Sequence, residues 1–396
     1  MLGVYGATVG AGTLFLPVEI GTRGPLVFFM LLLLAFPLSM VPHVLICRVF
    51  MRDHQTADKS LPMFGTFFGA KGQKAVRIYF CLAHFPVTLV YGVSLVNALD
   101  NLLREHLHIE LITRGWLAFI VVAFLLVVLS NGREKVVSIL STLALPFALT
   151  VVIIAAVQIP DWQLANITEA LKATNNAPTG ETIKNLWLTL PLITFAFCST
   201  PLISPLAAHY REKHNGGETK AVLVVRLAYT LIFFSIIFFV LSCILSIPHE
   251  TFVAAKAQNL NVLSVMEGNG GSGLLFYAAP LIAIIGMTKS FLGICLPVAE
   301  TFSALITETA GVNKGAGKII AFLLMFVVSF AVVYPNPNVI NLIETVCGPM
   351  IAIFLFLIPV FLIYTRDALR PLRGVTPMIV LLGGILTVSA LLYGML

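Results

Sequence analysis

A run of small residues near the start of the chain carries three glycines within seven positions. The stretch reads Gly6-Ala7-Thr8-Val9-Gly10-Ala11-Gly12-Thr13, and apolar residues follow it. Glycine disfavours a continuous helix. A bilayer core has no water to satisfy the backbone groups that a break releases, so such a break persists only where protein buries it or where it lines a cavity. The stretch is therefore predicted to form half of a substrate site in a broken helix.

A second interruption is predicted in the sixth apolar segment. There Phe197-Cys198-Ser199-Thr200 precedes Pro201, and proline removes a backbone donor and clashes with the preceding turn. Transporters with inverted repeats place breaks at corresponding positions in their two halves. Either stretch alone could be a simple kink. A break that opens each of two five-span units favours a shared site.

Two facing helix breaks present positive and negative ends that complement the two charges of a zwitterion. Half-helix N-termini present N–H groups and the positive end of the helix dipole, which attract a carboxylate. The opposite half-helix ends present carbonyl groups, which suit an ammonium group or a cation. An amino acid is therefore the predicted ligand.

Lys289 lies near the middle of a long apolar segment. A charged side chain at that depth is costly, so an intramembrane lysine predicts a functional group, here one that exchanges a proton. The alternative is a structural ion pair with Glu300 or Glu344. Glu300 is about 16 Å farther along the same helix, which disfavours that pairing.

The composition predicts a membrane protein. Of 396 residues, 59% are hydrophobic and only 11% are charged, whereas soluble domains are about a quarter charged. About 20 apolar residues cross a bilayer. The predicted spans are 2–20, 25–50, 78–102, 115–131, 136–159, 186–208, 221–247, 273–306, 318–334, 339–364 and 375–396.

The basic residues predict the orientation of these spans. Seventeen of the 24 Lys and Arg residues fall in one set of alternate connections, six in the other and one, Lys289, within a span. Because cytoplasmic loops carry the positive excess, we expect a cytoplasmic N-terminus and an extracytoplasmic C-terminus. The polar connections 160–185 and 248–272 would lie outside, and the basic segment 53–76 along the inner surface. The net charge of +6 therefore gives no indication of nucleic-acid binding.

Other functional classes lack their motifs. The sequence has no HExxH or GxSxG motif, and 311–318 departs from the P-loop pattern, so no enzyme is predicted. The six cysteines form no CxxC pair and the histidines show no ligand spacing within a span, so no metal site or other cofactor is predicted. A channel would need a symmetric or repeatedly polar pore, which the sequence does not indicate.

The first-span motif YGATVGAGTLFLP, which ends at Pro17, resembles the signature of the hydroxy and aromatic amino acid permease family. The resemblance continues through Phe195-Ala196-Phe197, Lys289-Ser290-Phe291-Leu292-Gly293 and Cys347-Gly348-Pro349, and covers essentially the whole chain. These permeases are bacterial inner-membrane symporters of amino acids and protons with the LeuT-type fold. The chain is most similar to the branch that transports serine and threonine.

The resemblance implies roles for particular residues. The implied substrate-binding set is Thr8, Gly10, Ala11, Gly12 and Thr13 of the first span, Tyr91 of the third, and Phe197, Cys198, Ser199 and Thr200 of the sixth. In sodium-coupled proteins of this fold, one sodium ion lies between first-span carbonyls and eighth-span hydroxyls. Here Gly6 and Val9 match the carbonyl positions, while Thr288 and Lys289 match the hydroxyl positions. An ammonium in place of sodium implies proton coupling.

The predicted fold is all-α, with about eleven membrane helices in a LeuT-type, five-plus-five inverted repeat. The repeats span 1–159 and 186–364 within one transporter domain, the first and sixth helices are broken, and an extra helix follows at 375–396. Only five residues precede Gly6, so the first half-helix should be short. We expect a monomeric functional unit in the bacterial inner membrane, whose partners are the lipid bilayer and an amino acid. The expected activity is import of serine or threonine with a proton; an aromatic substrate (tryptophan or tyrosine) or sodium coupling is the alternative.

Overall fold

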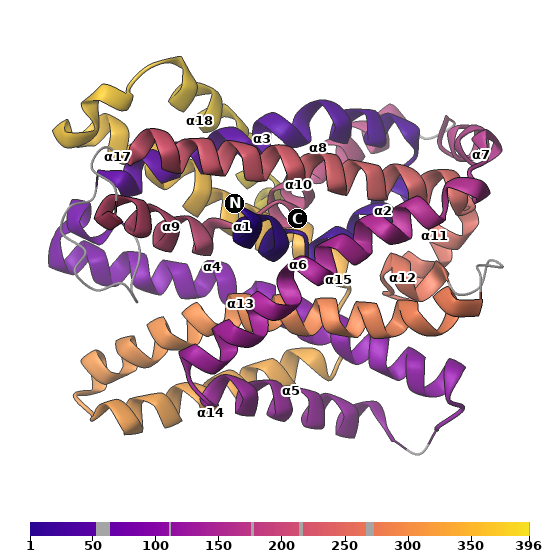
Figure 1. Ribbon diagram of the computed structural model, residues 1–396, viewed down its shortest axis with the longest axis horizontal. Coiled ribbons are helices and arrows are strands. Elements are labelled where there is room, and N and C mark those ends of the chain that lie inside the picture. The colour runs from indigo at the N-terminus through magenta and orange to yellow at the C-terminus, as the bar shows by residue number, and fades with distance from the viewer. Residues whose placement is uncertain (53–63, 111, 176–177, 214–216, 267–272, 396) are drawn as a thin grey trace.

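The computed structural model describes residues 1–52, 64–110, 112–175, 178–213, 217–266 and 273–395, which form helices and their connections (Figure 1). The longer helices are α1 Leu2–Thr8, α2 Ala11–Arg23, α3 Pro25–Met51, α4 Gly65–Asn101, α5 Arg114–Ser130, α6 Arg133–Val157, α7 Leu164–Asn175, α8 Thr179–Ala196, α9 Thr200–Lys213, α10 Glu218–Ser246, α11 His249–Ala257, α13 Gly273–Ala310, α14 Lys314–Val333, α17 Ile358–Thr365 and α18 Val375–Val388. The shorter elements are η1 Leu102–His106, η2 Ile159–Asp161, α12 Val262–Val265, α15 Val339–Leu342, η4 Ile343–Cys347, α16 Gly348–Ala352, η5 Ile353–Leu357, η6 Asp367–Leu372 and α19 Ala390–Met395.

Helix length and composition account for the predicted spans. Within the described residues, eight helical runs are long and apolar enough to cross a membrane, and two bent pairs, α1–α2 and α8–α9, qualify together. The apolar helix α5 is shorter, at 17 residues. These elements correspond one-to-one with the eleven predicted ranges. The all-helical membrane fold with broken first and sixth helices is therefore confirmed.

The predicted polar connections contain helices of their own. The connection 160–185 includes α7, and 248–272 includes α11 and α12, although 267–272 lie outside the described residues. Of the segment 53–76, residues 53–63 lie outside the described part, and the rest from Gly65 onward belongs to α4. Gly69 interrupts α4 with a φ of 69°, a conformation that glycine adopts without steric cost.

The first helix packs one face against its neighbours: Val4, Tyr5, Gly6 and Thr8 are buried, whereas Leu2 is exposed. Figure 1 shows α1 near the centre of the view, and its neighbours in space are α6 and α10. A Cβ atom at Gly6 would lie 2.7 Å from the backbone carbon of Ala144 in α6, so only glycine permits this approach. The long helix α13 packs on α4, α6 and α14 and brings its middle close to α1.

Candidate functional site

The first span is interrupted at Val9 and Gly10. The half-helices α1 and α2 meet at 50°, and Gly10 is extended, with φ −144° and ψ −157°. The break releases carbonyls at the end of α1 and an N–H at the start of α2. Ala11 donates its N–H to Ser290 Oγ of α13 at 2.9 Å, so a neighbouring helix satisfies this donor within the apolar interior.

Lys289 satisfies the released carbonyls. Its Nζ donates to Gly6 O at 2.6 Å and to Val9 O at 2.8 Å. The ammonium also lies 4.7 Å from the ring centroid of Phe147 in α6, and the residue is only 2% exposed. Two carbonyls and an aromatic face form an environment that suits a cation.

The two carboxylates considered as alternative partners of Lys289 pair elsewhere. Glu300 binds Arg133 at 2.7 Å, and Glu344 binds Arg23 at 2.6 Å. The Lys289 ammonium is therefore held by backbone carbonyls and an aromatic ring instead of a carboxylate.

The sixth span is interrupted at Phe197, Cys198 and Ser199. The half-helices α8 and α9 meet at 43°, and Pro201 lies in the first turn of α9, where its missing N–H costs no helical hydrogen bond. The freed groups bind two other spans. Tyr229 of α10 contacts Phe197 O at 3.0 Å and Ser199 Oγ at 2.5 Å, and His43 Nε2 of α3 accepts the Ser199 N–H at 3.2 Å.

A cavity of about 700 Å³ lies between the two breaks. Near the breaks it is lined by Thr8, Gly10, Gly12, Tyr91, Phe195, Ala196, Cys198, Ser199, Lys289 and Ser290. It extends past the end of α9 and the start of α6 to Met1 and Leu2, which are 44% and 49% exposed. The cavity therefore reaches the surface on the face that holds the N-terminus.

A buried charge network closes the opposite face. Arg23, at the end of α2, pairs with Glu19 at 2.5 Å and with Glu344 of η4 at 2.6 Å. Lys256 of α11 reaches Glu19 at 2.7 Å. Glu19 and Glu344 are 0% and 4% exposed. Removing one member of such a pair typically costs about 3–5 kcal/mol, because it leaves an uncompensated buried charge. The network therefore fastens α2, α11 and η4 together.

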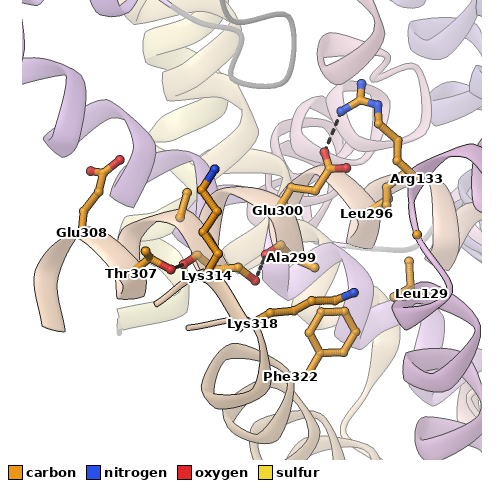
Figure 2. Close-up of a pocket in the computed structure, with 13 residues that line it drawn as sticks. Leu129, Arg133, Leu296, Ala299, Glu300, Thr307, Glu308, Lys314, Lys318 and Phe322 are labelled. Atoms are coloured by element: carbon orange, nitrogen blue, oxygen red, sulfur yellow. Dashed lines mark hydrogen bonds and ion pairs between the residues drawn. The ribbon is translucent and has the colours of Figure 1, made fainter. Parts of the chain in front are cut away.

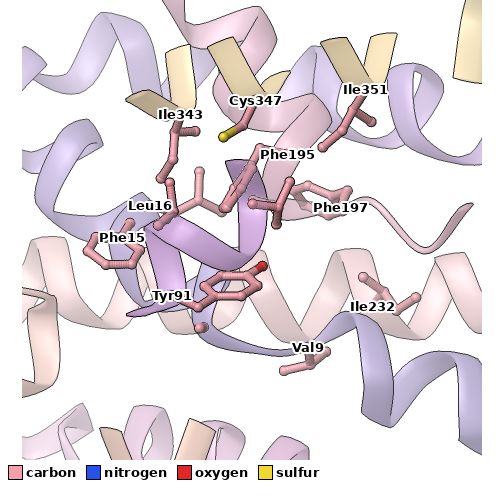
Figure 3. Close-up of a cluster of buried hydrophobic side chains, with 14 of the residues drawn as sticks. Val9, Phe15, Leu16, Tyr91, Phe195, Phe197, Ile232, Ile343, Cys347 and Ile351 are labelled. Atoms are coloured by element: carbon pink, nitrogen blue, oxygen red, sulfur yellow. The ribbon is translucent and has the colours of Figure 1, made fainter. Parts of the chain in front are cut away.

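Buried apolar side chains from several helices gather near the two breaks (Figure 3). Phe15 and Leu16 of α2 are fully buried, together with Ile343 and Cys347 of η4. Tyr91 of α4 has its ring centroid 5.8 Å from that of Phe195. Apolar side chains of α2 and η4 are thus buried near the breaks, and the Tyr91–Phe195 pair also lines the cavity.

A second hollow, of about 440 Å³, is lined by the end of α5, the start of α6, the second half of α13 and the start of α14 (Figure 2). Arg133 and Glu300 pair across it, and Lys318 lies over the ring of Phe322, 5.6 Å from its centroid. Neither helix break contributes to its lining. The hollow between the breaks is therefore the candidate functional site.

The structure brings together part of the residue set that the sequence implied. Thr8, Gly10, Gly12, Tyr91, Cys198, Ser199 and Lys289 line the cavity, whereas Gly6, Val9, Ala11, Thr13, Phe197, Thr200 and Thr288 are not part of its lining. Gly6, Val9, Ala11 and Phe197 act through backbone atoms. Thr13 is fully buried, and its hydroxyl has no hydrogen-bond partner in the described structure.

Three residues of the site were missed by sequence reasoning. Ser290, not Thr288, provides the hydroxyl that binds the first break. His43 and Tyr229 bind the second break. Of the three, His43 was signalled by the sequence, because it is an ionisable residue within an apolar span and such residues are functional candidates by default.

A cavity at two facing helix breaks, open toward one face and sealed toward the other, is the architecture of a secondary transporter. The chain belongs to the family of transmembrane amino acid transporter proteins, whose profile matches residues 2–246. It is 30% identical to the serine transporter SdaC of Escherichia coli (strain K12), over 100% of this chain and 94% of that protein. It is also 32% identical to the inner membrane transport protein YqeG of the same strain, over 98% and 96% of the two chains.

A solved structure shares the fold. A variant of the manganese transporter of Eremococcus coleocola superposes with a TM-score of 0.65 over 99% of this chain and 84% of the other, at 11% sequence identity. That likeness concerns the fold alone. The family match and the curated relatives confirm the prediction of an amino acid transporter that is not an enzyme.

Proposed function

We propose that this protein imports a small hydroxy amino acid, with serine as the first candidate, together with a proton. The observation that carries the proposal is the contact of the Lys289 ammonium with the carbonyls of Gly6 and Val9. This contact joins the first and eighth spans beside the substrate cavity. The similarity to the serine transporter SdaC supports the choice of substrate.

The substrate carboxylate is proposed to bind at the N-terminus of α2. Gly10 and Gly12 line the cavity there without side chains that would block the backbone, and the helix dipole favours an anion. The rest of the amino acid would face the α8–α9 break, where Cys198 and Ser199 line the cavity. A zwitterion can thus meet a half-helix N-terminus at one end and polar groups of a second break at the other.

The proton is proposed to act as the coupling ion at Lys289, with no metal or organic cofactor. In its protonated form the side chain donates to both carbonyls and fastens α1 to α13. Loss of the proton removes the charge and weakens those bonds, because charge-assisted hydrogen bonds are about twice as strong as neutral ones. Release of α1 would then free this half-helix to move relative to α13, and that movement would change the face to which the cavity opens.

The protein is a multi-pass membrane protein, and we place it in the bacterial inner membrane with a cytoplasmic N-terminus and a monomeric functional unit. The distribution of Lys and Arg and the printed name of the relative YqeG support this placement. The proposed inverted repeats, 1–159 and 186–364, are supported by the breaks in α1–α2 and α8–α9. Retained serine binding in nanodiscs that hold one copy each would test the monomer, and its loss would contradict it.

A topology reporter tests the orientation. Alkaline phosphatase fused after Leu396 is expected to be active and β-galactosidase at the same position inactive, since an odd number of spans puts the two termini on opposite sides. The reverse pattern would mean that one of the proposed spans does not cross the membrane.

Binding and uptake test the activity. Serine at about 100 times its Kd is expected to stabilise the purified protein by about 2.7 kcal/mol, which a thermal shift can detect among the twenty amino acids. In proteoliposomes, serine uptake is expected to be driven by an inward proton gradient and to be independent of the sodium concentration. Stabilisation by tryptophan or tyrosine alone would mean that the substrate is an aromatic amino acid and not serine. Uptake that needs sodium would mean that sodium, and not the proton, is the coupling ion.

A further inference from the structure

The hydrogen bonds at the sixth-span break fix the direction of each donor. Phe197 O can only accept, and the Tyr229 hydroxyl, at 3.0 Å, has a single proton to give. Ser199 Oγ lies 2.5 Å from the same hydroxyl, so Ser199 must donate its own proton to Tyr229. The bonds thus form a chain in which Ser199 donates to Tyr229 and Tyr229 donates to Phe197.

The histidine beside this chain is fixed in the same way. Ser199 N–H donates to His43 Nε2 at 3.2 Å, so this ring nitrogen carries no proton. The proton is then on Nδ1, which donates to Ser39 O at 2.7 Å. The His43 ring stacks on Tyr229 with centroids 4.5 Å apart, and both residues are almost fully buried. Each hydrogen-bonding group of Ser199, Tyr229 and His43 is therefore fixed as either a donor or an acceptor.

We propose that Tyr229 and His43 are positioning residues that hold the α8–α9 break open and orient Ser199 as a pure acceptor toward the cavity, so that the site selects a substrate with a hydrogen-bond donor on its side chain. This proposal deepens, and rests on, the proposed transport of a hydroxy amino acid. Ser199 lines the cavity but has given its only proton to Tyr229. Its oxygen can still accept a hydrogen bond from a substrate hydroxyl, as serine offers, but it has no O–H left to donate to an ether oxygen.

The selectivity arm of the test compares serine with O-methylserine, which keeps the oxygen but lacks its proton. The wild type is expected to prefer serine by about tenfold, the value of one well-made hydrogen bond. In Tyr229→Phe the Ser199 hydroxyl regains a free proton, can donate to the ether oxygen, and the ratio of the two Kd values should fall toward one. Ser199→Ala should remove the preference as well. A general packing defect would weaken both ligands equally, so an unchanged ratio in both variants would overturn the orientation of Ser199.

The positioning arm needs no ligand. Hydrogen–deuterium exchange of peptides that cover 195–202 is expected to rise about tenfold in Tyr229→Phe and in His43→Leu, because each loses a hydrogen bond to the break. His43→Gln should recover part of the protection, since its amide oxygen can accept from Ser199. Tyr79→Phe is the matched control: the Tyr79 hydroxyl also donates to a backbone carbonyl, that of Met350 at 2.9 Å, but away from the break. Unchanged exchange at 195–202 in Tyr229→Phe and His43→Leu would overturn the positioning role. If the wild type binds no amino acid, the proposed function fails, but the exchange measurement still tests whether Tyr229 and His43 position the break.

Discussion

Lys289→Ala is expected to reduce pH-driven accumulation of serine to a ratio of about one. With one proton per substrate and the membrane potential clamped at zero, a gradient of one pH unit supplies about 1.4 kcal/mol, enough for about tenfold accumulation by the wild type. Alanine removes the group that binds Gly6 O and Val9 O, so no proton would be carried. Exchange of internal for external serine, which needs no net proton movement, should survive in part. Uptake of labelled serine into proteoliposomes measures both.

Lys289→Arg separates charge from titration. Arginine keeps a positive charge that a protein does not neutralise, so this variant should bind serine and fail to accumulate it. Lys172→Ala is the control for loss of a lysine, because Lys172 is exposed on α7 and should accumulate serine normally. Full accumulation by Lys289→Ala, or by Lys289→Arg, would remove Lys289 from the coupling step.

Gly12→Leu is expected to weaken serine binding by about 10- to 100-fold while the protein remains folded. A Cβ atom at Gly12 would lie 3.2 Å from Ala196 Cα and 3.2 Å from the Phe195 ring, so the first added carbon already presses on α8. The remaining carbons of leucine must enter the cavity or push the two breaks apart. Overpacking of this kind costs about 1–3 kcal/mol, which gives the stated range of affinity. Titration calorimetry measures the loss.

Gly3→Leu is the matched control for that substitution. Gly3 lines the same cavity nearer its mouth, and a Cβ there would meet no atom within 4 Å. Its serine affinity should match the wild type, and both variants should elute as single species in size-exclusion chromatography. Wild-type affinity in Gly12→Leu would exclude the first-span break from the binding site. Should Gly12→Leu not fold, Gly12→Ala is expected to show a smaller loss in the same direction.

Local sequence features predicted the spans and their breaks. Apolar length alone defines a membrane helix, and glycine or proline marks where such a helix stops. The first break falls at Val9 and Gly10, inside the glycine-rich stretch, and the second falls just before Pro201. Both signals lie within a few residues of the feature that they predict.

The side-chain partners of the breaks could not be predicted in this way. His43, Tyr229 and Ser290 lie on three different spans, and their contacts depend on how those helices rotate and slide against one another. The hydrophobic pattern of a fully buried span carries little information on rotation, because most faces are apolar. The contact of Lys289 with the first break was implied by family resemblance instead of spacing, and its role in coupling stays a prediction.

The four charges that close the face opposite the cavity are balanced. Glu19 and Glu344 carry two negative charges, and Arg23 and Lys256 carry two positive ones. A voltage across the membrane does work of about 2.3 kcal/mol per elementary charge per 100 mV, but a neutral group that moves as a unit contributes no net charge displacement. Opening and closing of that face would therefore be electrically silent. The voltage would instead act on the uncompensated ammonium of Lys289, so a transient current in a reconstituted membrane would report on the proton and not on the movement of these four residues.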